Sequence, residues 1–181
     1  MASWSAIIGG IRANKAGYAW RIGQALAHRG FRVGGFVQEA VRDDDGSIIG
    51  WDVVRLLDGR SHTLARVSNE PHLCSWRFDE RGFHAAASWL SEPGLDVVVV
   101  DSVGKLEAAG TGHYPALSAR ILAPDAPHVI ACIRDTSLAT IVLGLPDPIA
   151  SLELPASPDV TQHFVDDLDD LLRPDAPSVR R

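Results

Sequence analysis

The chain has 181 residues, of which 46% are hydrophobic and 22% are charged, close to the averages of globular domains. This length favours a single domain with one core, and the composition excludes a disordered, collagen-like or coiled-coil chain. The formal net charge of −6 argues against a nucleic-acid partner, because such a surface needs a basic stripe, but it allows a local cationic site.

The setting expected from the sequence is the cytoplasm. No apolar run reaches the roughly 18 residues of a membrane helix, and no basic region precedes an apolar stretch at the N-terminus. We therefore expect neither membrane insertion nor secretion. Cys74 and Cys132 lie far apart without a CxxC pair, so the sequence does not support a disulfide framework and a reduced compartment is the simpler interpretation.

Apolar spacing divides the first half of the chain into a strand, a helix and an antiparallel meander. Two glycines stop the first strand, and Gly30 is expected at the end of the helix. Turn signals at 43–47 and at Asp58-Gly59 separate the strands of the meander. In chain order we expect strands at 4–8, 31–37, 37–42, 48–57 and 62–67, a loop at 68–77, and helices at 15–28 and 79–90.

The second half contains four consecutive valines, which predict a central strand buried on both faces of a parallel sheet. A C-terminal helix is predicted from an apolar stripe, and the aspartates off this stripe are interpreted as a solvated face. The stripe consists of Val160, Phe164, Leu168 and Leu171. In order we expect strands at 95–101, 127–133 and 149–154, helices at 113–122 and 159–172, and a flexible tail at 173–181.

Strands that alternate with helical periods predict one three-layer α/β domain over residues 1–172. Its sheet is expected to be mostly parallel, with a small antiparallel extension around residues 37–67. In this prediction the strands at 5–8 and 96–100 are parallel neighbours.

A strand followed by GxxxxGK(S/T) and a helix is a P-loop, in which backbone N–H groups hold phosphate, the lysine neutralises it and the hydroxyl binds Mg2+. The first glycine and the lysine are in register here. Asn14 replaces the second glycine and is able to enter the left-handed region, whereas Ala16 has no oxygen for a metal. The candidate anion-binding residues are Gly9, Gly10, Ile11, Arg12, Ala13, Asn14, Lys15 and Ala16.

Charged residues in and beyond this loop also favour a phosphate-binding site. Lys15 and Lys105 are the two lysines among 17 basic residues; by number alone chance explains them better than a need for a compact point charge, and the position of Lys15 in the loop adds weight to the second explanation. We expect Lys15 to project into a solvated site with little packing. Asp101 ends a buried strand where P-loop proteins place the acid that holds Mg2+, with a turn cap as the alternative. Arg134 follows another strand and is expected to touch a base or phosphate, or to pair near Asp135.

Three further stretches, at 33–42, 50–60 and 96–107, follow the loop. With it they resemble the small P-loop nucleoside triphosphatases of the thermophile and cancer-related type, which include a bacterial branch carried as a domain of unknown function. That family shows Gly-Phe-x-Thr-Glu-Glu-Val-Arg, then Gly-Phe-Asp, then Asp-Glu-Ile-Gly-Lys-Met-Glu. In order and spacing the match covers most of residues 5–135.

The resemblance implies binding of a nucleoside triphosphate with broad base preference, and slow Mg2+-dependent hydrolysis. It implies that Lys15 holds phosphates, that Asp101 holds the metal, and that three residues flank the reaction as catalytic candidates. These are Glu39, Lys105 and Glu107.

The chain departs from the family pattern at two positions. Ser102 stands where the family has a glutamate that activates water, and Ala16 lacks the hydroxyl. Each loss costs a factor of roughly 100 or more in turnover, unless Glu39 or Glu107 takes over as base.

Two other groups of residues are candidates for a site. His62, His72, Cys74 and His84 fall in one stretch, and His72-x-Cys74 offers two soft or borderline metal ligands. The spacing matches no zinc pattern, so isolated side chains are the favoured interpretation and a metal site is the alternative. Four tryptophans are expected either to stack a base or to lie in the core. They are Trp20, Trp51, Trp76 and Trp89.

Three classes of function follow from these observations. The first is a weak nucleoside triphosphatase. The second is a non-hydrolysing module that holds a nucleotide or a small oxyanion such as phosphate, sulfate or molybdate in the altered loop. The third is an interaction protein, for example a homo-oligomer, that keeps the fold as a scaffold.

Overall fold

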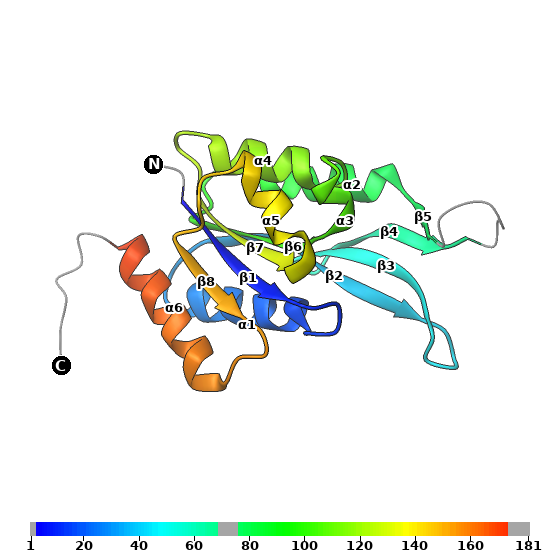
Figure 1. The fold of residues 1–181 in the computed structure, drawn as a ribbon, viewed down its shortest axis with the longest axis horizontal. Helices are drawn as coiled ribbons and strands as arrows, with labels where there is room; N and C mark the ends of the chain where they lie inside the picture. Colours follow the sequence, from blue (N-terminus) through cyan, green and yellow to red (C-terminus); the bar gives the residue numbers. More distant parts are fainter. Residues whose placement is uncertain (1–2, 69–75, 174–181) are drawn as a thin grey trace.

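The computed structural model describes residues 3–68 and 76–173, which form an eight-stranded sheet with helices on both faces (Figure 1). The sheet order is β5-β4-β3-β2-β6-β7-β1-β8. The strands are β1 (Trp4–Gly9), β2 (Val33–Arg42), β3 (Ile48–Arg55), β4 (Ser61–Val67), β5 (Trp76–Phe78), β6 (Val97–Val103), β7 (His128–Arg134) and β8 (Ala150–Glu153). The helices are α1 (Lys15–His28), α2 (Glu80–Leu90), α3 (Lys105–Ala108), α4 (Tyr114–Leu122), α5 (Leu138–Ile141) and α6 (Pro158–Leu172).

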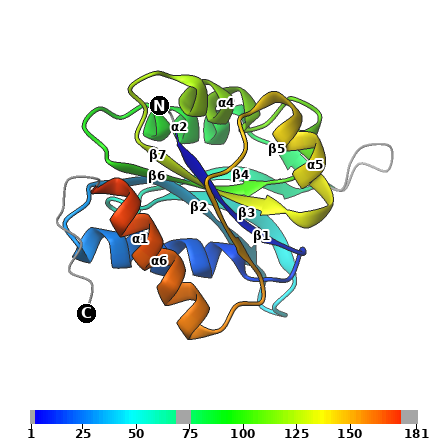
Figure 2. The same ribbon diagram turned by 60° about the vertical axis from the view of Figure 1, so that its left-hand side comes forward.

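Two apolar cores hold the layers together, one on each face of the sheet. Helices α1 and α6 pack on one face, while α2 and α4 cover the other (Figure 2). The valines of β6 alternate between the cores, because Val97 and Val99 face α1 whereas Val98 and Val100 face the opposite layer. The prediction of a central strand buried on both faces is therefore confirmed.

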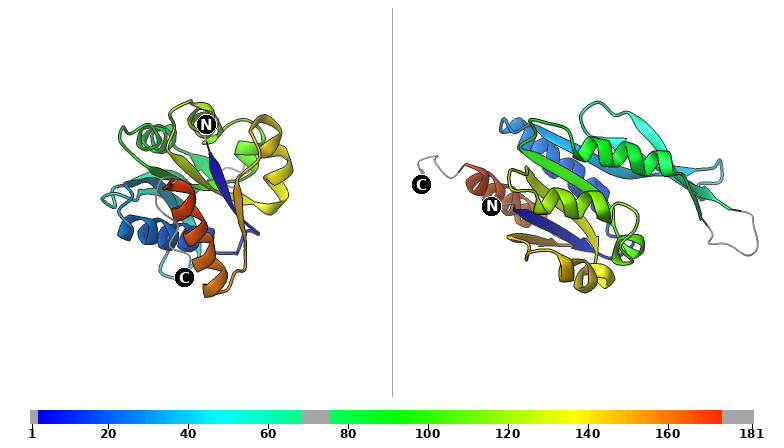
Figure 3. Two further views of the ribbon diagram at one scale, coloured as in Figure 1. Left: turned by 90° about the vertical axis from the view of Figure 1, so that its left-hand side faces the viewer. Right: turned by 90° about the horizontal axis from the view of Figure 1, so that it is seen from above.

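The fold class is confirmed as three-layer α/β. Strands β2, β6, β7, β1 and β8 run parallel, and β3, β4 and β5 add an antiparallel extension that projects to one side (Figure 3). The prediction that β1 and β6 are neighbours was wrong. Strand β7 lies between them and pairs in parallel with both, because its apolar residues need cover on both faces.

Several boundaries also differ from the prediction. The two strands expected at 31–37 and 37–42 are one continuous strand, β2, and Trp76–Phe78 pairs with β4 instead of continuing the expected loop. The rest of that loop, with His72 and Cys74, lies outside the described residues. The sequence prediction also missed α3 and the short helical turns around α5.

Helix α6 presents a different apolar face from the one expected. Phe164 and Leu168 are buried with Val165, whereas Val160 and Leu171 are 50% and 41% exposed. The aspartates are not all on a solvated face as expected, because Arg29 of α1 forms ion pairs with Asp166 and Asp169 and so ties the two helices together. Arg173 also pairs with Asp169, and the remainder of the expected tail, at 174–181, is outside the description. The domain boundary at residue 172 stays a prediction.

None of the described helices has the length and apolar character needed to cross a membrane.

A glycine in β2 sets how closely β2 and β6 approach. Gly35 has φ +92°, and a Cβ there would lie 2.0 Å from the carbonyl oxygen of Val99. We predict that Gly35→Ala lowers the free energy of unfolding by at least about 2 kcal/mol more than Gly30→Ala does, as measured by urea titration. Gly30 is a matched control, because its φ is +94° with nothing within 4 Å, so it costs only about 1 kcal/mol of backbone strain. Equal losses in the two variants would contradict this account.

Candidate functional site

The loop at 9–16 joins β1 to α1 at the carboxyl end of the parallel strands (Figure 2). The N–H of Ala13 donates to the Gly10 carbonyl at 3.2 Å, which closes a turn. Asn14 adopts the left-handed conformation with φ 52° and ψ 41°, as the sequence predicted. The backbone thus curves back at Asn14 and starts α1 at Lys15, so that the helix N-terminus faces the loop.

Lys15 lies beneath this loop and is only 8% exposed. Its Nζ donates to the carbonyls of Gly9 at 2.9 Å and Gly10 at 2.7 Å. The expectation that Lys15 projects into solvent was therefore wrong, because the ammonium group is needed to satisfy two carbonyls of its own loop. Burial lowers the pKa of Lys15, while the nearby Asp101 acts in the opposite direction.

Asp101 ends the buried part of β6 and is 2% exposed. Its Oδ2 accepts the backbone N–H of Gln38 at 3.0 Å. Burial raises the pKa of Asp101 to about 6, opposed by the Gln38 hydrogen bond and the charge of Lys15. This carboxyl group is thus held between β2 and the loop, and it is ionised above about pH 6.

Cys132 lies opposite Asp101 in the pairing of β6 with β7. Its thiol donates to the Lys15 carbonyl at 3.8 Å, and burial raises its pKa well above the usual range. Cys132 and the backbone of Gln38 were missed as parts of this site. The sequence carries no signal for the position of Cys132, because it depends on β7 lying between β1 and β6.

Arg134 ends β7 directly beside Gly9 in the strand register. Its charge contributes to lowering the pKa of Lys15, and its guanidinium group lies about 3.8 Å from where a side chain at Gly104 would begin. Within the described ranges Arg134 forms no ion pair, so the expected alternative of a salt bridge near Asp135 is not found. A second cation therefore stands next to the loop.

Glu107 is 5% exposed, and both of its oxygens accept backbone hydrogen bonds. Oε2 binds the N–H of Gly104 at 2.8 Å and Oε1 binds that of His113 at 2.9 Å. The carboxylate therefore caps α3 and fixes the start of α4. Lys105, at the first turn of α3, is exposed.

An open depression of about 490 Å³ lies between the loop and β2. Glu39 is exposed there, so the structure brings this acid, unlike Glu107, to the same hollow as the loop. Trp20 is the tryptophan that borders the hollow, whereas Trp89 belongs to the core, as the alternative interpretation expected. The lining residues are Asn14, Ala16, Gly17, Trp20, Val37, Gln38, Glu39 and Ala40.

A larger hollow of about 660 Å³ lies at the opposite end of the parallel strands, where Ser3, Leu95 and His128 lie at or just before the strand starts. It does not touch the loop. His128 there is 2% exposed and its two ring nitrogens bind the hydroxyls of Ser3 and Ser5. Both ring nitrogens of His128 are therefore engaged within the fold.

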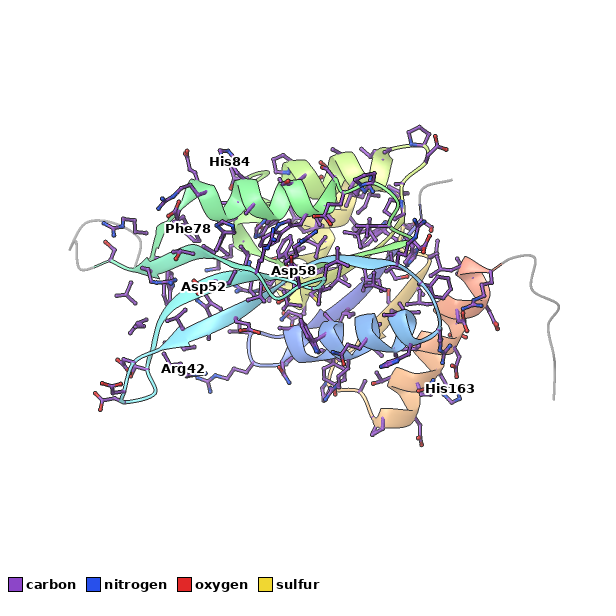
Figure 4. The ribbon with its side chains drawn as sticks, turned by 180° about the vertical axis from the view of Figure 1, so that it is seen from behind. Arg42, Asp52, Asp58, Phe78, His84 and His163 are labelled. Carbon is purple, nitrogen blue, oxygen red and sulfur yellow. The ribbon has the colours of Figure 1, made fainter. Side chains whose placement is uncertain are left out.

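No group of three histidine, cysteine, aspartate or glutamate side chains among the described residues is arranged to hold a metal. His62 contacts the ring of Trp89 at 5.8 Å between centroids. His84 is exposed on the outer side of α2 (Figure 4).

The sequence profile of a family described as NTPase matches residues 6–144. The solution structure of a human cancer-related nucleoside triphosphatase superposes with a TM-score of 0.70, with 22% identity over 97% of this chain and 100% of that one. The crystal structure of THEP1 from the hyperthermophile Aquifex aeolicus gives 0.60, with 17% identity over 93% and 98%. At these identities the likeness shows a shared fold.

A curated protein, molybdenum import ATP-binding protein ModC 2 of Bradyrhizobium diazoefficiens, is 29% identical over 104 residues. The match covers 55% of this chain and 11% of that protein. The chain therefore spans only a small part of the length of this relative.

The buried carboxyl group generates a prediction for stability. The pKa of Asp101 is raised from 3.8 to about 6, so the folded protein binds this proton more tightly than the unfolded chain. Its ionisation lowers the free energy of unfolding as pH rises from about 4 to about 6. We predict that the free energy of unfolding of Asp101→Asn, measured relative to that of the parent, increases by up to about 3 kcal/mol across this interval and then stays level. Urea titrations between about pH 4 and about pH 8 measure this difference.

Taking the difference between Asp101→Asn and the parent cancels the contributions of other titrating groups. Burial lowers the pKa of His113 and His128 to about 4, so their stabilising effect is present above about pH 6.5 and is lost as pH falls. Both proteins contain these histidines, and their effect cancels in the difference. A difference that stays flat or shrinks with rising pH would show that Asp101 is not the desolvated group described.

Proposed function

The chain belongs to the NTPase family, and from this premise we propose that it binds a nucleoside triphosphate in the loop between β1 and α1, with slow Mg2+-dependent hydrolysis. The observation that carries the proposal is the geometry of Lys15. Its ammonium group holds the carbonyls of Gly9 and Gly10 inward, which leaves backbone N–H groups of the loop and the N-terminus of α1 free to bind phosphate. Arg134 adds a second positive charge beside them. A cytoplasmic setting is part of this proposal.

The residues present fit Mg2+ in one respect and fall short in another. Asp101 offers a carboxylate at the end of β6 that is ionised at neutral pH, whereas Ala16 offers no oxygen. Mg2+ is commonly held by one or two carboxylates with water and substrate phosphates, so Asp101 suffices as its protein anchor. When bound, Mg2+ would neutralise charge that develops on the phosphate oxygens.

Slow turnover follows from the acids available. Glu107 uses both oxygens to bind backbone N–H groups, and Ser102 lacks a carboxylate. Glu39 is exposed in the hollow beside the loop, and we propose it as the group that accepts the proton of the attacking water. Lys105 and Glu107 are proposed to flank the site, Lys105 as a cation and Glu107 by fixing the chain from Gly104 to His113.

The second candidate is a non-hydrolysing module for a nucleotide or a small oxyanion. It is favoured by the donors themselves, because backbone N–H groups and Lys15 bind a tetrahedral anion without a hydroxyl or a base. The relative named for molybdenum import makes molybdate one oxyanion to test, with phosphate and sulfate. A homo-oligomeric scaffold stays a prediction without support from the site.

Calorimetric titration separates these functions. We predict that ATP and GTP bind with similar affinities and that Mg2+ strengthens both. Binding of molybdate or sulfate without binding of nucleotides would favour the second candidate instead. Absence of binding by any of these ligands would remove both.

Lys15→Ala should abolish binding of ATP, since it removes the loop's central cation. It also leaves two inward carbonyls without a donor, so we predict a loss of about 1–3 kcal/mol in the free energy of unfolding. Lys105→Ala is the matched control for stability, because that side chain is exposed and its loss should leave the melting temperature unchanged. Retained ATP affinity in Lys15→Ala would overturn the proposed site.

Restoring the missing groups tests the account of turnover. The double variant Ala16→Thr with Ser102→Glu should hydrolyse ATP or GTP at least roughly tenfold faster than the parent, equal to about 1.4 kcal/mol of barrier. Steady-state release of phosphate measures this rate. A double variant that binds ATP without faster turnover would place the second candidate ahead of the enzyme.

A further inference from the structure

His113 is a buried polar residue at the N-terminus of α4, only 3% exposed. Its ring contacts the rings of Phe36 and Phe83, with centroids 4.6 and 4.9 Å away. Its Nε2 lies 3.3 Å from the side-chain amide nitrogen of Gln38. That amide nitrogen carries only hydrogens, so it donates and the ring nitrogen accepts. Burial lowers the pKa of His113 to about 4, which leaves the accepting nitrogen unprotonated at neutral pH.

Gln38 lies just beyond the point where β2 and β6 stop pairing. The ladder between these strands ends with Phe36 opposite Val100. Two residues further along, the backbone N–H of Gln38 donates to the Asp101 carboxylate at 3.0 Å. This hydrogen bond spans strands that no longer pair, so it depends on how firmly Gln38 is held. Strand β3 pairs with Gln38 on its other side, and the contact with His113 holds its side chain.

We propose that His113 is a positioning residue for the Mg2+ site, because it fixes Gln38 and through it the orientation of the Asp101 carboxylate. Removing a group that orients a metal ligand in this way typically costs about 10–100-fold in metal affinity or activity. His113 is itself held by Glu107, which accepts its backbone N–H at 2.9 Å. Contacts therefore connect Glu107, beside the site, to the carboxylate of Asp101. This role rests on the proposed function, binding of a nucleoside triphosphate with Mg2+.

The first test needs no nucleotide and measures the hydrogen bond itself, by amide hydrogen exchange followed with NMR. His113→Phe keeps an aromatic ring beside Phe36 and Phe83 but removes the accepting nitrogen. We expect the backbone N–H of Gln38 to exchange at least roughly tenfold faster in this variant, while the N–H groups of β2 that pair with β6 keep their rates. His113→Gln offers an amide oxygen near the place of Nε2 and should retain most of the protection.

The second test measures ATP affinity by calorimetry, with and without Mg2+. We expect the gain in affinity from Mg2+ to fall roughly tenfold in His113→Phe and to be recovered in His113→Gln. Gln38→Met removes the same contact from the other side and keeps the backbone N–H, so it should lower the gain equally. Because both substitutions break one contact, the double variant should lower the gain no further than either does alone.

His128→Phe is the matched control for loss of a buried imidazole. His128 is 2% exposed, and its ring nitrogens bind the hydroxyls of Ser3 and Ser5 at the other end of the strands. We expect this variant to lower the melting temperature, as His113→Phe does, but to leave the Mg2+ gain and the exchange of the Gln38 N–H unchanged.

Four results would overturn this role in different ways. Unchanged exchange of the Gln38 N–H in both His113→Phe and Gln38→Met would show that the contact does not hold the hydrogen bond to Asp101. Faster exchange with an undiminished Mg2+ gain would show that the contact serves only the fold. An equal loss of Mg2+ gain in His128→Phe would assign the effect to lower stability. If the parent binds no ATP under either condition, the proposed function itself fails and the role toward Mg2+ fails with it, while the exchange rates still decide whether His113 holds Gln38.

Discussion

The buried ammonium group of Lys15 is the interaction on which the rest of the site depends. It is enclosed beneath the loop, where it satisfies two carbonyls and interacts with the charge of Asp101. Burial of a charge is costly unless it is paired and hydrogen-bonded, so loop curvature, strand ends and the carboxyl group must all keep their places. The same charge that organises the loop would also attract a phosphate to it.

The sheet supplies the surroundings that this charge needs. Because β7 lies between β1 and β6, Cys132 lies opposite Asp101, and Arg134 emerges next to Gly9. The neighbouring strand β2 holds Asp101 through the backbone of Gln38. Residues from four separate parts of the chain thus meet at the carboxyl ends of the parallel strands, where open α/β sheets bind their ligands.

Anion binding and hydrolysis require different groups at this site. Anion binding needs fixed backbone donors and positive charge, which the loop, Lys15 and Arg134 provide. Turnover also needs a free base and a well-held metal, yet Glu107 is engaged by two backbone N–H groups and Ala16 has no oxygen. Glu39 lies in the hollow beside the loop and is the acid proposed to serve as the base.

The sequence by itself determined the local features: the left-handed Asn14, the helix that begins at Lys15, and a valine strand with alternate residues in two cores. These follow from residue type and spacing, which act over a few neighbouring residues. Only the tertiary structure decided the order of the strands, the burial of Lys15 and the capping role of Glu107. Each depends on contacts between residues distant in sequence, because strand order reflects which strands need cover on both faces, and a carboxylate's role depends on which N–H groups the fold brings to it.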